Sequence, residues 1–394
     1  MRSPIPGPDP RTGHVDKRAL YVAKNFHPAH AGVIGALQLA GFDVGFVVHT
    51  SRSGDVKNGA GLVDVRTIEM HKNAVLTRLF STGTSAQSFP SLRWCLRLLR
   101  EERPELVLVY SHHASGVLIA LLARMLGARV ATVADKPRIL RRRRDWPRLL
   151  LGRLIRPRAM LHTGTYGPPG RAVPLGPLLG RSFAAPYPVL VPDREANVGT
   201  RHTAAPSAKP GDPVRVLCMS CANPRRSRLT LPLEAIERAG LADRIELTFA
   251  RQSHRDETSV IRARESELGL PESRILLDLS DQELRRLYSE SFDLLVYPAE
   301  RVDYGQTVGE ALAYGLPAIC GDSIGARILI EHGGNGYVYP ARDADGLAEV
   351  LRLACDEGRV GLAEMGGRAR SMATVTHSPE AWTRSLYRAL DMAY

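Results

Sequence analysis

The sequence predicts two α/β domains, each built around a parallel β-sheet. In both halves of the chain, apolar segments rich in branched residues alternate with helix-length segments, which is the pattern of βαβ units. The chain has 394 residues, a length that suits two such domains better than one core. A polar stretch without apolar periodicity lies between the halves, and we expect the interdomain linker there, at residues 196–213.

Each half contains its own series of strand candidates. In the first half they lie at 19–23, 43–48, 106–110, 128–134 and 159–163. In the second half they lie at 214–220, 244–250, 274–279, 293–298, 317–322 and 337–340. Helix-length segments separate most of them, so consecutive strands are expected to pair in parallel through crossover helices.

The composition is that of a soluble globular protein, with 44% hydrophobic and 24% charged residues. No run of apolar residues approaches the roughly 18 to 20 that a membrane-spanning helix needs. The N-terminal segment 1–14 lacks the apolar stretch of a signal peptide. The sequence therefore predicts a cytoplasmic protein.

Positive charge is concentrated in one segment, Lys136–Arg158, of a chain whose net charge is +12. Ten Lys or Arg face the single acid Asp145 there, and leucines are interleaved with the cations. Such a surface suits an anionic membrane, at which the protein would be peripheral. The alternative is a solvated helix with an apolar inner face. No recognised nucleic-acid module accompanies the charge, so a nucleic-acid partner is not expected.

Two short motifs resemble metal sites but are expected to have other roles. Cys218 and Cys221 form a CxxC, but no second pair or nearby histidine completes a zinc site, so we expect reduced thiols. Asp343 and Asp345 form a DxD at the start of a predicted helix, where an aspartate is expected to be the N-cap. We therefore expect neither a metal ion nor another cofactor.

The segment that follows the strand at 293–298 has the pattern of a diphosphate and ribose site. A loop containing Gly305 leads into a helix that is expected to begin near Thr307, where free backbone N–H groups can bind an anion. Glu310 is expected in the first turn of this helix, where the helix dipole favours a carboxylate. That carboxylate can accept hydrogen bonds from two sugar hydroxyls, or it can serve only to stabilise the helix.

The residues from Asp293 to Leu351 resemble the C-terminal domain of retaining GT-B glycosyltransferases of family 4. In that family a loop of the type acid-x-aromatic-Gly-x-x-x-x-Glu leads into a helix of the type EAxAxGxP. This chain has Tyr304, Gly305 and Glu310, followed by the rest of EALAYGLP. The resemblance is looser over 214–394, and the N-terminal half matches mainly in the order of its elements.

The resemblance implies two Rossmann-like domains that face each other across a cleft, with the reaction between them. We expect an acceptor-binding domain at 1–195 and a nucleotide-sugar-binding domain at 214–375, with the last helix, 376–394, returning to the first domain. The implied activity is transfer of a hexose-type sugar from a nucleotide-sugar donor, UDP-sugar being favoured, with retention. The acceptor would be a small molecule or lipid-linked, in a cell-envelope glycan or a glycosylated natural product.

By the same resemblance, Glu310 would hold the ribose of the donor, and the amides around Gln306 and Thr307 would face its diphosphate. The first acid of the family motif aligns with Val302 here. Asp303 lies one place later and Glu300 two places earlier, and either could turn toward the donor sugar.

The resemblance also implies cations that neutralise the leaving diphosphate. The arginine position of the family falls on Arg226, and its lysine position falls on Ser227, with Arg228 next to it. Fixed positive groups stabilise charge that develops on the β-phosphate without having to reorganise. We therefore predict that Arg226 and Arg228 bind the donor, the alternative being a solvated basic turn.

Acceptor-side candidates lie after the strands of the first half. The family has a Gly-Gly loop near the donor phosphates after its first strand, and Gly32 is the only glycine in the matching loop here. His112 and His113 follow the strand at 106–110, and ligands bind at such strand ends. Asp135 ends the next strand and is our candidate for orienting the acceptor or accepting its proton.

Two alternatives to a transferase remain at this stage. A nucleotide-sugar epimerase could use the same architecture, but it would need several acids and histidines around the anomeric carbon. A non-catalytic GT-B subunit would explain Val302, Ser227 and Ala134 at positions where relatives carry functional groups.

Overall fold

The structure is a computed structural model of the chain. The described residues are 17–23, 28–48, 63, 65–71, 90–110, 114–134, 159–162, 172–174, 181–191, 209, 211–219, 226–251, 257–302 and 305–392. They form two compact units, one made of residues 1–190 with 377–394 and the other of residues 191–376. Most of the predicted linker, 196–213, lies outside the described residues.

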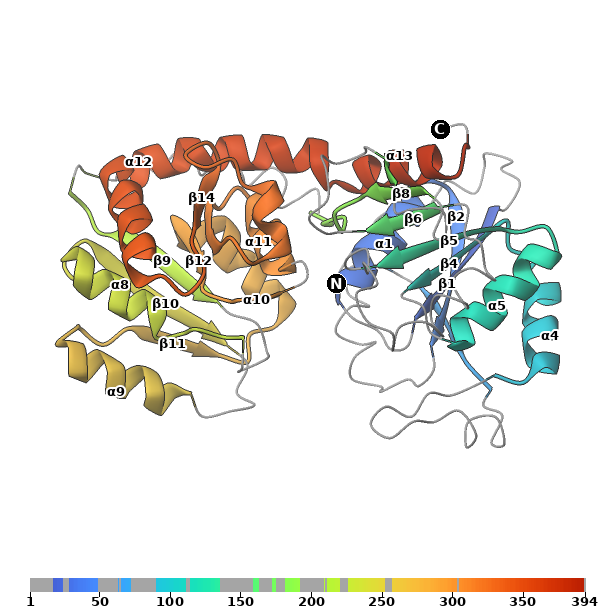
Figure 1. Cartoon of the computed structure of the whole chain (residues 1–394), viewed down its shortest axis with the longest axis horizontal. Coiled ribbons are helices and arrows are strands. Elements are labelled where there is room, and N and C mark those ends of the chain that lie inside the picture. Colours follow the sequence, from blue (N-terminus) through green and yellow to red (C-terminus); the bar gives the residue numbers. More distant parts are fainter. Residues whose placement is uncertain are drawn as a thin grey trace, which may run out of the picture. The chain divides into compact units, whose positions relative to one another are not determined.

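The first unit contains an eight-stranded sheet in which every pairing but one is parallel (Figure 1). In sheet order, its strands are β3 (Arg66–Glu69), β2 (Phe42–Val48), β1 (Lys17–Ala23), β4 (Leu106–Tyr110), β5 (Arg129–Ala134), β6 (Ala159–His162), β8 (Arg181–Ala184) and β7 (Ala172–Pro174). The antiparallel pair is β7 with β8. The five predicted strands of this half are confirmed, whereas β3, β7 and β8, with three or four residues each, are too short for their pattern to have indicated them.

Four helices accompany this sheet in the described part of the first unit: α1 (Pro28–Leu39), α4 (Leu92–Glu102), α5 (Ala114–Met125) and α13 (Pro379–Ala389). Ser91 caps α4, because its hydroxyl accepts a hydrogen bond from the N–H of Trp94 (3.2 Å). The C-terminal helix α13 packs against α1. There the hydroxyl of Thr383 donates to the carbonyl of Ala36 (3.1 Å), and Trp382 is buried.

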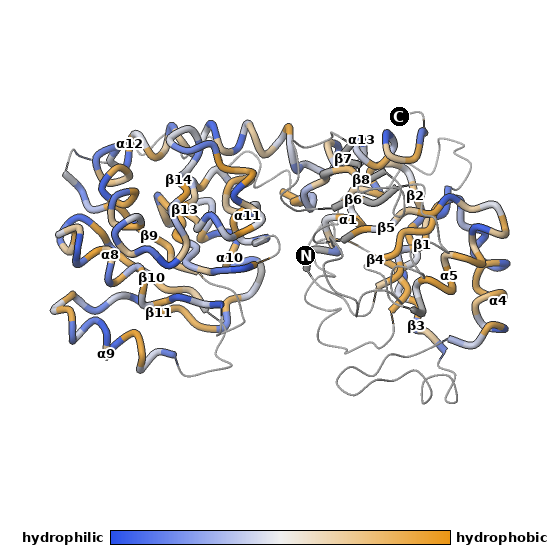
Figure 2. Tube along the Cα trace, viewed as in Figure 1, coloured by the Kyte–Doolittle hydropathy of each residue, from blue (hydrophilic) through white to orange (hydrophobic). Residues whose placement is uncertain are grey.

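The second unit contains a six-stranded sheet that is parallel throughout. In sheet order, its strands are β11 (Arg274–Leu277), β10 (Ile245–Arg251), β9 (Val214–Met219), β12 (Leu294–Tyr297), β13 (Ala318–Gly321) and β14 (Gly336–Tyr339). Figure 2 shows apolar residues concentrated along the strands of this sheet and hydrophilic ones along its outer helices. The expectation of two parallel-sheet α/β domains is thus confirmed.

Helices connect the strands of the second unit. They are α8 (Leu231–Ala239), α9 (Thr258–Leu268), α10 (Asp281–Arg286), a π-helical turn (Leu287–Ser291), α11 (Gln306–Ala313), a 3-10 turn (Gly325–Leu329) and α12 (Ala344–Thr376). α12 is kinked at Gly358, whose φ is 64°. No helix in the described ranges is both long and apolar enough to span a membrane.

The strand order of the second sheet fixes where a ligand can bind. From β9 the chain proceeds to β10 and β11 on one side, and it then returns to β12 and continues to β13 and β14 on the other. Loops after β9 and β12 therefore leave the sheet in opposite directions, and in α/β sheets the carboxyl ends of two such strands are where ligands bind. This reversal point is where the candidate site lies.

Candidate functional site

The loops that follow β9 and β12 are joined directly at the reversal point. Ser227 and Ala299 form an isolated antiparallel bridge. Next to it, the backbone N–H of Glu300 donates to the carbonyl of Arg226 (2.9 Å). Two loops about 70 residues apart in sequence are thereby held side by side, with charged residues on both of them.

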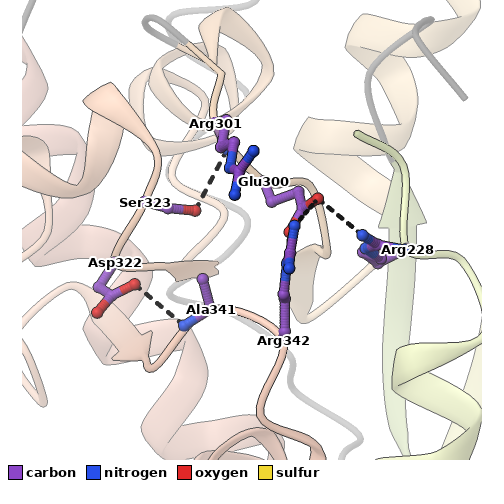
Figure 3. A network of polar contacts seen from close by, with 7 residues as sticks. All are labelled: Arg228, Glu300, Arg301, Asp322, Ser323, Ala341 and Arg342. Carbon is purple, nitrogen blue, oxygen red and sulfur yellow. Dashed lines mark hydrogen bonds and ion pairs between the residues drawn. The ribbon is translucent and has the colours of Figure 1, made fainter. Parts of the chain in front are cut away.

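Glu300 is the centre of the polar network at this point (Figure 3). Its carboxylate is buried, because the side chain is only 5% exposed. Nη2 of Arg228 donates to Oε1 (2.7 Å), Nη2 of Arg342 donates to the same oxygen (2.8 Å), and Nε of Arg342 donates to Oε2. A buried carboxylate is tolerated when it is paired in this way.

The two arginines also set the protonation state of Glu300. The hydrogen bonds from Arg342, and then those from Arg228, lower the pKa of the Glu300 carboxyl to about 2 against the opposing effect of burial. Arg228 and Arg342 themselves are partly open to solvent, with side chains 42% and 52% exposed. The Glu300 carboxylate is therefore held between two arginines, and both arginine side chains are partly exposed to solvent.

The loops after β13 and β14 bring Arg342 to this network. The backbone N–H of Ala341 donates to Oδ1 of Asp322 (3.0 Å), and the backbone N–H of Arg301 donates to the hydroxyl of Ser323 (3.3 Å). Arg342 has a positive φ of 71°, a conformation that non-glycine residues rarely adopt. Sequence reasoning missed Arg342 because it lies 42 residues from Glu300, in a turn with no ligand-like pattern.

The helix that was expected to bind the diphosphate, α11, begins one residue earlier than predicted. Gly305 is its N-cap with φ 82°, and the helix starts at Gln306. Glu310 is therefore the fifth helical residue, so the prediction that it lies in the first turn is wrong. Its Oε1 accepts a hydrogen bond from Nε2 of Gln306 (2.8 Å). It is half-buried, as is Thr307.

Tyr288 lies against the same carboxylate. Burial, and then the charge of Glu310 and a hydrogen bond to it, raise the pKa of the Tyr288 hydroxyl well above its ordinary value. A hydroxyl that stays protonated can donate to a carboxylate, which fixes the orientation of Glu310. The orientation of Glu310 thus depends on two neighbours, Gln306 and Tyr288.

Gly32 is not in the loop where we expected it. The helix α1 begins at Pro28, so Gly32 lies within that helix and is buried. A Cβ atom at this position would lie 1.8 Å from the carbonyl oxygen of Pro188. The close backbone approach that requires glycine is thus made to Pro188, and the prediction that Gly32 forms a phosphate-binding loop is wrong.

His30, two residues earlier, was not singled out from the sequence. It is buried, its Nδ1 lies 2.7 Å from the hydroxyl of Tyr21, and its ring contacts Tyr110 edge-on. Hydrophobic periodicity did not indicate His30, because it is a single polar residue near the start of a mostly apolar helix.

The remaining predicted residues divide into two groups. Arg226 is exposed beside the bridge between the two loops. Five lie outside the described residues: His112, His113, Asp135, Asp303 and Tyr304. The basic segment Lys136–Arg158 and Cys221 also lie outside them.

The DxD motif at the start of α12 serves the helix. Oδ1 of Asp343 accepts a hydrogen bond from the N–H of Asp345 (3.0 Å), which confirms the N-cap prediction. Asp345 pairs with Arg238 (3.0 Å). Across the described ranges, no group of three His, Cys, Asp or Glu side chains is placed to hold a metal ion. Cys218 is buried and reduced.

The lowered pKa of Glu300 predicts how stability depends on pH. A carboxyl whose pKa falls from 4.5 to about 2 on folding stabilises the protein fully above pH 4.5, and this contribution is lost as the pH falls toward 2. Glu300→Gln is expected to unfold at lower urea concentration than the wild type at pH 7, with the difference narrowing between pH 4.5 and 2. Glu349→Gln, at an exposed position on α12, should show no such narrowing. A constant difference for Glu300→Gln would contradict the assignment.

Residues 207–371 match the family model "Glycosyl transferases group 1". No curated protein matches the chain in sequence. Among solved structures, the chain is similar to a glycosyltransferase from Rickettsia africae (TM-score 0.66, 15% identity), with 96% of this chain and 98% of that chain covered. It is also similar to Anabaena Alr3699/HepE in complex with UDP (TM-score 0.64, 11% identity, 95% and 99% covered).

A third similar structure is the lipopolysaccharide outer core galactosyltransferase WaaB in its apo form, with a TM-score of 0.63 and 13% identity over 95% of this chain and 99% of that chain. At identities this low, the structural similarity shows a shared fold alone. The family match covers the unit that contains the Glu300 network. Together, the match over 207–371 and the shared fold support a glycosyltransferase with the GT-B fold.

Proposed function

We propose that the protein transfers a sugar from a nucleotide-diphosphate sugar to an acceptor hydroxyl with retention of anomeric configuration. The observation that carries this proposal is that one unit presents a partly exposed arginine, Arg228, after β9 and the N-terminus of α11 after β12, the two strands at which the strand order reverses. UDP-sugar is the favoured donor, because Alr3699/HepE, which shares the fold, binds UDP and UDP-glucose. The acceptor belongs to a cell-envelope glycan or a glycosylated natural product.

The donor would be bound through three kinds of contact. Arg228 and the exposed Arg226 donate charged hydrogen bonds to the diphosphate, and the amides at Gln306 and Thr307 bind it through the positive end of α11. Glu310, oriented by its neighbours, accepts hydrogen bonds from the ribose hydroxyls. Asp303, Tyr304 and Gly305 would line the donor sugar.

The transfer needs no covalent nucleophile and no metal ion in this proposal. The bond between the sugar C1 and the β-phosphate oxygen breaks, its electron pair stays on the diphosphate, and the acceptor oxygen bonds to C1 on the same face. Fixed arginines and helix amides stabilise the charge that develops on the diphosphate. The acceptor hydroxyl loses its proton, for which Asp135 is the candidate base, with His112 and His113 as acceptor contacts.

The ribose assignment is tested by Glu310→Gln. Loss of one charged acceptor should weaken UDP binding roughly 10- to 100-fold, since hydrogen bonds to charged groups contribute about 1.5–3 kcal/mol. Glu364→Gln, an exposed acid of α12 in the same unit, should bind UDP as the wild type does. Calorimetric titration with UDP in EDTA measures both. Equal affinity of Glu310→Gln and wild type would overturn the assignment, and binding only after addition of Mg²⁺ or Mn²⁺ would contradict the metal-free proposal.

We also propose that Lys136–Arg158 holds the protein on an anionic membrane where the acceptor is lipid-linked. Each Lys or Arg near such a surface contributes about 1 kcal/mol, so ten of them opposed by one acid give useful binding even when only some take part. The protein should co-sediment with vesicles that contain anionic lipid and be released by salt, because exposed charges are screened. Equal partitioning to neutral and anionic vesicles, or none to either, would favour a soluble acceptor.

A further inference from the structure

The two arginines that contact Glu300 bind it in different ways. Arg342 contacts both carboxylate oxygens, through Nε on Oε2 and Nη2 on Oε1. In the part of the chain that the structure describes, Arg228 makes its ion pair through Nη2 alone, on Oε1. A two-point contact of guanidinium with carboxylate is the stronger and more oriented of the two. Glu300 is thus held mainly by Arg342, and Arg228 keeps donors to spare.

The charges of the network add to one excess positive charge. Glu300 is ionised, because the pKa of its carboxyl is about 2, and each arginine contributes one positive charge. If Arg342 were absent, Glu300 would neutralise Arg228, and an approaching anion would meet a pair with no net charge. With Arg342 present, the carboxylate is already balanced.

We propose that Arg342 is a positioning residue that balances the Glu300 charge, so that Arg228 presents its positive charge and its free donors to the diphosphate of a nucleotide. This inference rests on the proposed function, since it assigns a role in binding the same ligand. Arg342 acts through Glu300 and Arg228 and need not touch the nucleotide.

The backbone of Arg342 lies in a region that costs free energy for a residue with a Cβ atom. A φ of 71° places Cβ close to the following carbonyl group, at a cost that glycine would not have. The side chain is half exposed and contributes little packing, so burial does not compensate for this strain. Arg301 shares a positive φ, and what distinguishes Arg342 from it is the two-point contact with Glu300.

Arg342→Gly tests the proposal without imposing a new backbone conformation. It should weaken binding of UDP, and of inorganic pyrophosphate, roughly tenfold, the effect of one charge at a partly exposed site. Thermal unfolding would confirm that the variant is folded.

Arg301→Gly is the matched control. It removes the same charge from a neighbouring exposed residue that also has a positive φ (52°). Within the described part of the chain, the Arg301 side chain makes no ion pair. Its affinity should change by no more than about twofold, because its charge is screened by solvent.

A double variant separates charge balance from a general loss of structure. Arg342→Gly with Glu300→Gln has the same net charge at the network as the wild type, so UDP affinity should return to near the wild-type value. Arg342→Lys, which keeps the charge but loses the two-point contact, should lie between the wild type and Arg342→Gly. The inference is overturned, with the proposed function intact, if the wild type binds UDP and Arg342→Gly binds it equally well, or if the double variant binds as weakly as Arg342→Gly. Failure of the wild type to bind UDP or pyrophosphate would overturn the proposed function and this inference with it.

Discussion

A buried carboxylate must be paired, and the pairing of Glu300 determines the arrangement of the loops around the candidate site. Its side chain is 5% exposed, so it requires hydrogen-bond donors that water would otherwise provide. The donors come from the loop after β9, through Arg228, and from the loop after β14, through Arg342. Three loops that are distant in sequence are thereby fixed at one edge of the sheet. Binding of a diphosphate there would add an anion to cations that are already oriented.

The topology of the second sheet explains why these loops meet at all. Parallel strands all end at the same edge, and the strand order reverses between β9 and β12, the kind of point at which α/β sheets bind ligands. The bridge between Ser227 and Ala299 joins the two loops there through their backbones. The N-terminus of α11, which follows β12, lies in the same unit, and the first N–H groups of a helix have no partner within the helix itself. The strand order of this sheet therefore determines both the fold of the unit and the position of the candidate site.

Local sequence patterns predicted the fold well and the site only in part. The strand at 106–110 was predicted with the bounds that β4 has, because a short apolar run between helix-length segments has few other interpretations. The prediction for Gly32 failed because this residue lies within α1 and not in a loop, and the close approach to Pro188 explains the glycine instead. Glu310 was predicted in the first turn of its helix but is the fifth residue of α11, because the helix begins directly after its N-cap, Gly305. Arg342 could not be found from one sequence, because its partnership with Glu300 exists only after three loops have folded together.

The most direct test of this account is a crystal structure of the full chain with UDP. We expect the β-phosphate within hydrogen-bond distance of the Arg228 guanidinium and of the α11 N-terminus. The ribose should lie on Glu310, and the contacts between Arg342 and Glu300 should be unchanged. The proposal would be contradicted by UDP bound away from the carboxyl ends of β9 and β12, or by Arg228 still directed only at Glu300 with the diphosphate held elsewhere.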